Sequence, residues 1–174
     1  MSNTNATQSP AERCFEYQLE ILGKEIEYLD RIIGRMDTIT QATKNWAIVT
    51  WTASVGFALG SEQLRPFGGA TAVLPLIFWL IDGTWRRLQK RSVYRTRKIS
   101  EFLNEGGLAA SLKQGKLVNF HVFDLVGSGH AGDEEFKDYV SLKKTLFFRE
   151  VFLIYWALAA ISLALDLIVA FNQL

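Results

Sequence analysis

Residues 146–171 are the stretch of the sequence that most limits what the chain can fold into. From Val151 to Phe171 the run carries a single charged residue, Asp166. An α-helix rises about 1.5 Å per residue, so about 20 apolar residues cross the roughly 30 Å of hydrocarbon in a bilayer. The sequence therefore predicts a transmembrane helix over residues 146–171, followed by a short tail, residues 172–174, outside the membrane.

Two shorter apolar stretches precede it, Asn45–Gly60 and Gly68–Ile81, joined only by SEQLRPF. Each falls short of a full crossing, but both are rich in Trp, Phe and small residues. A tight transmembrane hairpin over residues 45–82, with polar flanks completing each span, is a more economical interpretation than two buried helices of a soluble protein. The 49% hydrophobic composition, above the usual soluble balance, supports this prediction.

Positive charges are distributed unequally between the two sides that these spans define. Of the 19 Lys and Arg residues, only Arg65 lies in the hairpin loop, and the densest group, WRRLQKRSVYRTRK, directly follows the second span. Short cytosolic segments of membrane proteins carry an excess of Lys and Arg. We therefore expect a multi-pass protein with the N-terminus and residues 83–145 in the cytosol and the C-terminus outside.

Residues 11–44 have the spacing of a long amphipathic, coiled-coil-like helix, after a polar segment, residues 1–10, that we expect to be disordered. Apolar side chains recur in an a/d heptad pattern, at Phe15, Leu19, Leu22, Ile26, Leu29, Ile33 and Met36. Ile32 and Ile39 add a second column at g. This wide stripe fits either self-association of several copies or packing against the cytosolic region of the same chain. We expect the helix to continue into the first span.

The basic cytosolic region, residues 83–145, contains two less regular segments. SVYRTRKISEFLNEGG is typical of a helix ended by two glycines, whereas KLVNFHVFDLV fits either a short strand or an apolar helical turn. GSGHAG, with Gly127, Gly129 and Gly132, matches the G-x-G-x-x-G pattern of dinucleotide-binding loops. Three carboxylates follow it, and no room remains for a βαβ unit. We expect a flexible loop whose acidic residues begin the next helix.

The basic run after the second span admits three interpretations. Its cations bind a phosphorylated ligand such as a nucleotide signal, hold anionic lipid headgroups, or only set the topology. We favour the second and third interpretations, lipid binding and topology. The contacts to lipid or phosphate are expected from Arg86, Arg87, Lys90 and Arg91.

No residues are spaced as in a catalytic or metal site. Two histidines, His121 and His130, and the single Cys14 are too few for a closed zinc site. The sequence has no P-loop and no G-x-S-x-G elbow, and a net charge of +1 gives no footprint for nucleic acid. We expect no enzymatic activity, no metal or other cofactor, and no nucleic-acid partner.

Small residues lie within the apolar stretches. Gly56 and Gly60 form a GxxxG pair, and Ala157, Ala160 and Ala164 form a small-residue edge on the third helix. Small residues allow membrane helices to approach closely, so these positions predict helix packing within one chain or between chains.

Three charged residues fall within or beside the spans. We expect Asp166, near the outer end of the third helix, to pair with Arg65, and Asp82, at the inner end of the second, to pair with Arg86 or Arg149. In the functional alternative, Asp166 is repeated around an oligomer and forms a cation-attracting ring at a pore mouth.

The segments NWAIVTWTASVGFALG, LIFWLIDGTWRRLQKR and YRTRKISEFLN, within residues 12 to 104, resemble the SLATT-like small two-transmembrane effectors of bacterial antiviral and nucleotide-signalling systems. The resemblance implies an oligomeric protein that perforates or depolarises the bacterial inner (plasma) membrane when a cytosolic partner or nucleotide signal reports infection. The third helix departs from the two-span plan.

Two functions follow as hypotheses. In the first, the chain is a small homo-oligomeric membrane protein that forms a pore or disrupts the membrane as a defence effector. In the alternative, it is a non-conducting anchor whose heptad helix recruits a cytosolic partner.

Overall fold

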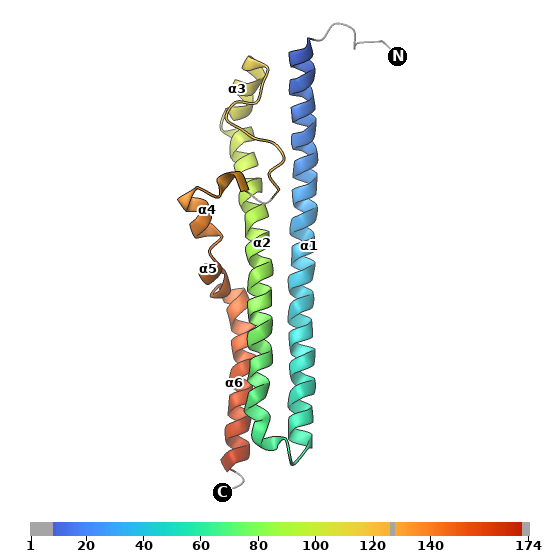
Figure 1. Ribbon diagram of the computed structural model, residues 1–174, viewed down its shortest axis with the longest axis vertical. Coiled ribbons are helices and arrows are strands. Elements are labelled where there is room, and N and C mark those ends of the chain that lie inside the picture. The colour runs from blue at the N-terminus through green and yellow to red at the C-terminus, as the bar shows by residue number, and fades with distance from the viewer. Residues whose placement is uncertain (1–8, 126–127, 172–174) are drawn as a thin grey trace, which may run out of the picture. The chain divides into compact units, whose positions relative to one another are not determined.

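The computed structural model describes residues 9–125 and 128–171, and every regular element in that part of the chain is a helix (Figure 1). The predicted all-α fold is confirmed. The expectations for residues 1–8, for the tail and for Gly127 lie outside the described residues. The elements are α1 (Pro10–Gly60), η2 (Arg65–Ala72), α2 (Val73–Asn104), α3 (Gly107–Gln114), η3 (Ser128–His130), α4 (Glu134–Tyr139), α5 (Leu142–Leu146) and α6 (Arg149–Phe171).

Helix α1 begins with a reciprocal cap. The Ser9 backbone N–H donates to Glu12 Oε2 at 2.6 Å, the Glu12 N–H donates to Ser9 Oγ at 3.2 Å, and Pro10 occupies the first turn, where it needs no N–H partner. The expectation that residues 1–10 are disordered is therefore wrong for Ser9 and Pro10, which form the start of α1. The predicted continuation of the heptad helix into the first apolar stretch is confirmed, because α1 runs to Gly60.

The chain divides into two compact units, and α1 and α2 contribute to both. Unit 1 consists of Met1–Gly34 and Gln89–Tyr139, and unit 2 consists of Arg35–Leu88 and Val140–Leu174. Each is described by itself below.

The core of unit 1 joins the heptad stripe to the basic helix. Leu22 and Leu29 of α1 pack with Ile99 and Phe102 of α2, and segment 117–125 covers them. The stripe is therefore packed within the chain at these positions. The buried face of α1 is centred on heptad positions d and g and not on a and d as expected. Ile26, at an a position, is 39% exposed, whereas Glu25, at the neighbouring g position, is buried.

Residues 116–125 form neither a strand nor a helical turn, so both interpretations of KLVNFHVFDLV are wrong. Two non-glycine residues in this segment, Asn119 and Phe123, have positive φ values of 53° and 68°. Such conformations are unfavourable for most L-residues and persist only when surrounding contacts hold them. The predicted glycine stop of α2 is confirmed, because the helix ends at Asn104 and Gly106 has a φ of 89°.

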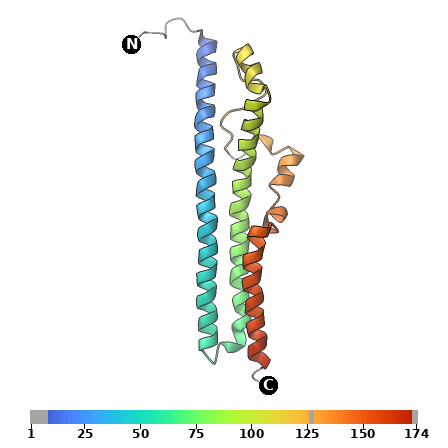
Figure 2. The same cartoon turned by 180° about the vertical axis from the view of Figure 1, so that it is seen from behind.

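In unit 2, α6 lies alongside the first part of α2 (Figures 1 and 2). Ala47 of α1, Phe78 of α2, and Val151 and Tyr155 of α6 share one core, and η2 packs against α6. The predicted helix over residues 146–171 is shorter at its start, because α5 ends at Leu146 and α6 begins at Arg149.

Two helical segments are long and apolar enough to cross a membrane, Arg65–Asn104 and Glu134–Phe171. In their most apolar windows only 33% and 22% of the residues are buried, unlike the core helices of a soluble protein, which are mostly buried.

Candidate functional site

Unit 2 exposes many of its large apolar side chains, while small and polar side chains are among those buried beside Val151 and Tyr155. Phe57, Leu80 and Leu163 are 72%, 51% and 54% exposed. The buried side chains of the same helices include Ala47 and Ser162, at 1% and 0% exposure. A soluble domain buries its large apolar residues instead. This arrangement fits a helical unit that is surrounded by lipid, where helices pack through small and polar residues.

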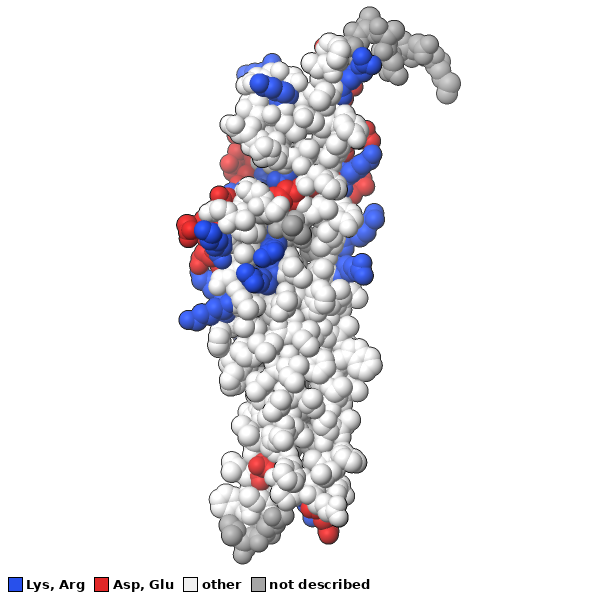
Figure 3. Space-filling model, in the orientation of Figure 1, with Lys and Arg blue, Asp and Glu red and all other residues white. Residues whose placement is uncertain are grey.

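The same unit has a surface band without charge (Figure 3). No Asp, Glu, Lys or Arg occurs in residues 45–61, 66–81 or 151–165, one stretch in each helical segment of unit 2. Every Lys and Arg of unit 2 except Arg65 lies on the other side of these stretches from the 61–65 turn, before residue 45, after residue 81 or before residue 151. The charge distribution thus defines two ends separated by an apolar belt.

At the end of unit 2 that carries these cations, ionic contacts join three helices. Arg86 of α2 lies 3.6 Å from Asp37 of α1 and 3.4 Å from Glu150 at the start of α6. Arg87 Nε donates to the carbonyl of Val140 at 2.9 Å. Two of the four cations expected to contact lipid or phosphate therefore also hold the unit together.

The expected pairing of Asp82 is wrong. Its carboxylate is 0% exposed, and within the described residues no group donates a hydrogen bond to either oxygen, neither Arg86 nor Arg149 included. Arg86 makes its ion pairs to Asp37 and Glu150 instead.

The expected Arg65–Asp166 pair is also wrong. Asp166 accepts a hydrogen bond from the backbone N–H of Gly69 at 3.0 Å, while Arg65 Nε donates to the Leu59 carbonyl at 3.1 Å. A Cβ at position 69 would lie 2.8 Å from Asp166 Oδ2, so any larger residue there would force the Asp166 side chain to move. Asp166 therefore fastens α6 to the η2 segment of the hairpin loop.

One turn deeper, Ser162 joins the same elements. The Trp51 indole Nε1–H of α1 donates to Ser162 Oγ at 2.7 Å, and Thr71 Oγ1 lies 3.1 Å from it. The spacing of Tyr155, Ser162 and Asp166 places the polar groups of α6 along one helix face.

The small-residue edges predicted for helix packing face outward. Gly56 and Gly60 are exposed, and a Cβ built on either would meet nothing within 4 Å. Ala157, Ala160 and Ala164 of α6 are exposed as well. These residues do not pack the helices of their own unit.

In unit 1, a buried ion pair fastens segment 117–125 to both helices. Arg95 Nε and Nη2 donate to Glu25 at 2.7 and 3.2 Å, and the backbone N–H groups of Phe123 and Asp124 donate to the same carboxylate at 2.6 and 3.0 Å. Arg95 Nη2 also donates to the His121 carbonyl at 2.5 Å. Both side chains are at most 2% exposed. We call this arrangement the Glu25–Arg95 clamp.

Sequence reasoning missed the clamp, although a signal was present. Glu25 lies three residues after Leu22 and four before Leu29, a spacing that puts a carboxylate on the buried face of α1. A charged group at such a position requires a charged or hydrogen-bonding partner.

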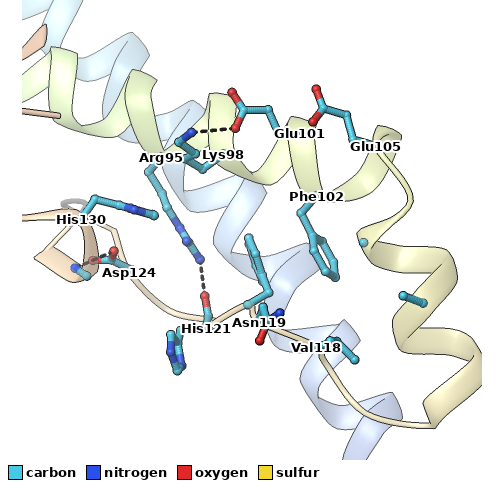
Figure 4. A pocket seen from close by; sticks show the side chains of 14 residues that line it. Arg95, Lys98, Glu101, Phe102, Glu105, Val118, Asn119, His121, Asp124 and His130 are labelled. Atoms are coloured by element: carbon cyan, nitrogen blue, oxygen red, sulfur yellow. Dashed lines mark hydrogen bonds and ion pairs between the residues drawn. The ribbon is translucent and has the colours of Figure 1, made fainter. Parts of the chain in front are cut away.

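Beside the clamp lies a cavity of about 480 Å³ (Figure 4). Phe102 and Phe120 stack in its wall with ring centroids 4.2 Å apart, and Lys98 pairs with Glu101 at 2.8 Å. His121 and His130 both line it. No group of three metal-binding side chains occurs within residues 9–125 and 128–171.

In the described part of the glycine-rich loop, two backbone N–H groups that could bind a phosphate are already occupied. Its backbone N–H groups at Ser128 and Gly129 donate to Asp124 at 2.7 and 3.0 Å, so a carboxylate of the chain occupies them. His130 Nδ1 lies 3.0 Å from Asp133 Oδ2.

Several cations of the basic helix also have partners inside unit 1. Arg97 and Lys98 both pair with Glu135 of α4, and Lys90 lies over the Tyr139 ring at 5.5 Å. The hydrogen bond and charge of Arg97 hold the pKa of the Glu135 carboxyl below its ordinary value.

No family model, curated protein or solved structure matches the chain. The function is therefore inferred from the contacts and charges of the chain itself.

Proposed function

We propose that the chain is a three-span integral membrane protein that assembles with copies of itself and makes the membrane permeable to ions. The observation that carries this proposal is the reversed arrangement of unit 2, in which Phe57, Leu80 and Leu163 face outward while Ala47 and Ser162 are buried. In water these side chains would form a large apolar patch of the kind that marks an interaction surface. In lipid they are in their preferred surroundings.

The first span is the final part of α1, residues 45–60, although only the two later segments are long and apolar enough by themselves. Its support comes from packing, because Ala47 lies in the same core as Tyr155 of α6. A helix held against two spanning helices shares their apolar surroundings.

The orientation follows from the charges at the ends of unit 2. Lys44, Arg86 and Arg149 flank the inner ends of the three spans, and Arg65 is the one cation of the hairpin loop. By the positive-inside rule, unit 1 is then cytosolic and the C-terminal end of α6 lies outside.

Self-association is assigned to the membrane, because Leu22 and Leu29 of the heptad stripe pack within unit 1. The outward edges at Gly56 and Gly60 on α1, and at Ala160 and Ala164 on α6, leave helix backbones accessible to a second copy. Thr52, one turn before Gly56, is exposed and gives the α1 edge a polar group that can face a water-filled path.

The biological setting follows the resemblance to SLATT-like effectors, which makes the chain an inner-membrane defence effector released by a cytosolic signal. In the alternative function, the chain is a non-conducting anchor. The exposed Tyr17 and Tyr28 of α1 favour this alternative, because they give unit 1 an aromatic surface for a protein partner.

The test compares wild-type protein with Gly56→Leu/Gly60→Leu in liposomes loaded with potassium. Cross-linking reports assembly and potassium release reports permeability. Val49→Leu is the matched control, because Val49 is also exposed on the same helix but is already a branched residue.

We expect the wild type to cross-link into oligomers and to release potassium, the double variant to lose both, and the control to keep both. Oligomers without release under every trigger tested would contradict the pore and favour the anchor. Release that survives in a monomeric double variant would contradict assembly through α1.

A further inference from the structure

We propose that Asp82 is a proton-binding site inside unit 2, reached from the cytosolic side, and that its carboxyl group holds a proton at neutral pH. This inference rests on the membrane insertion proposed above, but it does not require that the protein conducts ions. The assigned ligand is a proton and not a metal ion.

The first observation is the burial of Asp82 without a hydrogen-bond donor. The residue is 0% exposed, and neither oxygen has a donor in the described part of the chain. An ionised carboxylate without donors is far less stable in an apolar interior than in water, and such a group neutralises itself by binding a proton. By contrast, Asp166 in the same unit has the Gly69 N–H as a donor.

The second observation is the hydroxyl of Tyr155, which is also buried, is close enough to Asp82 to interact with it electrostatically, and is the nearest potential donor, although it is not in hydrogen-bonding geometry. An ionised carboxylate can only accept hydrogen bonds, whereas a protonated carboxyl and a phenol can each donate and accept. Tyr155 can offer one O–H to the two oxygens of Asp82, which is too little to replace water around an ionised carboxylate, whereas a protonated Asp82 can share one hydrogen bond with Tyr155 in either direction.

The charged and titratable groups that act on Asp82 come from all three helices around it. Lys44 belongs to α1, Arg86 to α2 and Tyr155 to α6. Arg86 is shared with Asp37 and Glu150. The positive charges of Lys44 and Arg86 allow Asp82 to lose its proton, although burial still favours the protonated form. Asp82 can therefore exchange its proton.

The proposed route for exchange passes Arg86, one helical turn after Asp82 in the sequence. Lys44 and Arg86 also line an open polar cavity of about 600 Å³, together with Asp37, Thr40, Gln41 and Asn45. A proton from this cavity adds to the Asp82 carboxylate and forms an O–H bond, and the reverse step returns it to water. No other bond changes and no oxidant or reductant is required.

The test is infrared difference spectroscopy of the full-length protein in liposomes at pH 7. Asp82→Asn is subtracted from the wild type, and the signal sought is the C=O stretch of a protonated carboxylic acid. Asp166→Asn is the matched control. We expect the acid band in the Asp82 difference spectrum and none in that of Asp166, and we expect Tyr155→Phe to shift the band.

A wild type labelled with ¹³C at the aspartate carboxyl gives a second measurement that does not depend on a folded variant. The acid band must move to lower frequency with the label, and it must move again in D₂O. Absence of an acid band at pH 7 overturns the proposal, and so does a carboxylate band that responds to sodium. Potassium release measured on the same liposomes tests permeability separately, so a band without release leaves this site intact while contradicting the pore.

Discussion

Removing Arg95 from the Glu25–Arg95 clamp gives the sharpest quantitative prediction for unit 1. Arg95→Ala takes away donors at 2.7 and 3.2 Å from a carboxylate that is 0% exposed, and leaves it only the Phe123 and Asp124 N–H groups. Breaking a buried ion pair by removing one partner costs about 3–5 kcal/mol. That is a large share of the roughly 5–15 kcal/mol that stabilises a domain.

The assay is amide hydrogen exchange, because the clamp fastens segment 117–125 through two backbone N–H groups. A tenfold change in the opening equilibrium corresponds to about 1.4 kcal/mol, so exchange at Phe123 and Asp124 should accelerate by roughly 10² to 10³ or more. Both amides should lose their protection together.

Arg97→Ala is the matched control on the same helix. Arg97 also pairs with carboxylates, but its side chain is 43% exposed. Exposed pairs contribute about 0–1 kcal/mol, so exchange at the same amides should change by less than about fivefold. Acceleration below tenfold in Arg95→Ala, or equal acceleration in both variants, would show that the buried ion pair does not hold segment 117–125 in place.

Three further predictions concern single contacts. Gly69→Ala should lower the melting temperature in detergent, because the new Cβ would lie 2.8 Å from Asp166 Oδ2. Ser162→Ala should move the Trp51 indole N–H resonance upfield in the NMR spectrum, since that N–H loses an acceptor at 2.7 Å, and should cost about 0.6 kcal/mol in lipid. Arg97 holds the pKa of Glu135 below its ordinary value of 4.5. The stabilisation from this pair is therefore complete above about pH 4.5 and is lost as the pH falls through the lower folded-state value, and an NMR titration of the carboxyl carbon should show Arg97→Gln returning the midpoint toward 4.5.

A specific result would contradict each of these three predictions. A melting temperature for Gly69→Ala equal to that of Gly56→Ala, where nothing lies within 4 Å, would show that the Asp166 contact is not tight. An unchanged Trp51 resonance in Ser162→Ala would show that the Trp51 indole does not donate to Ser162. A Glu135 titration midpoint that is the same in wild type and in Arg97→Gln would show that these two side chains do not form an ion pair.

The long helices could be predicted from the sequence because their signals are periodic or compositional. The heptad spacing from Phe15 to Met36 and the glycines after Asn104 follow from local geometry, and both the long α1 and the end of α2 agree with them. The apolar run before Phe171 likewise identified α6, although its first turn is replaced by a break at residues 147–148.

The candidate sites depended on contacts that local patterns do not specify. Charge alone predicts that Asp166 pairs with Arg65, whereas the structure gives Asp166 a backbone donor, Gly69. Arg95 looked like one cation among many in the basic run, and only the fold brings it to Glu25 across 70 residues. Spacing gives the face on which a charged residue lies, but the tertiary contacts give its partner.

The most direct test of the membrane assignment is to measure whether the outward side chains of unit 2 are surrounded by lipid or by water. Nitroxide labels are placed singly at Val49, Leu80 and Leu163, all exposed, in a Cys14→Ser background, with Tyr28 of unit 1 as the reference. Their collision rates with oxygen, which partitions into lipid, and with a polar nickel chelate, which stays in water, are then compared in liposomes. We expect collisions with oxygen to dominate at all three positions and collisions with the nickel chelate to dominate at Tyr28. Nickel accessibility at Val49, Leu80 and Leu163 equal to that at Tyr28 would contradict the membrane assignment.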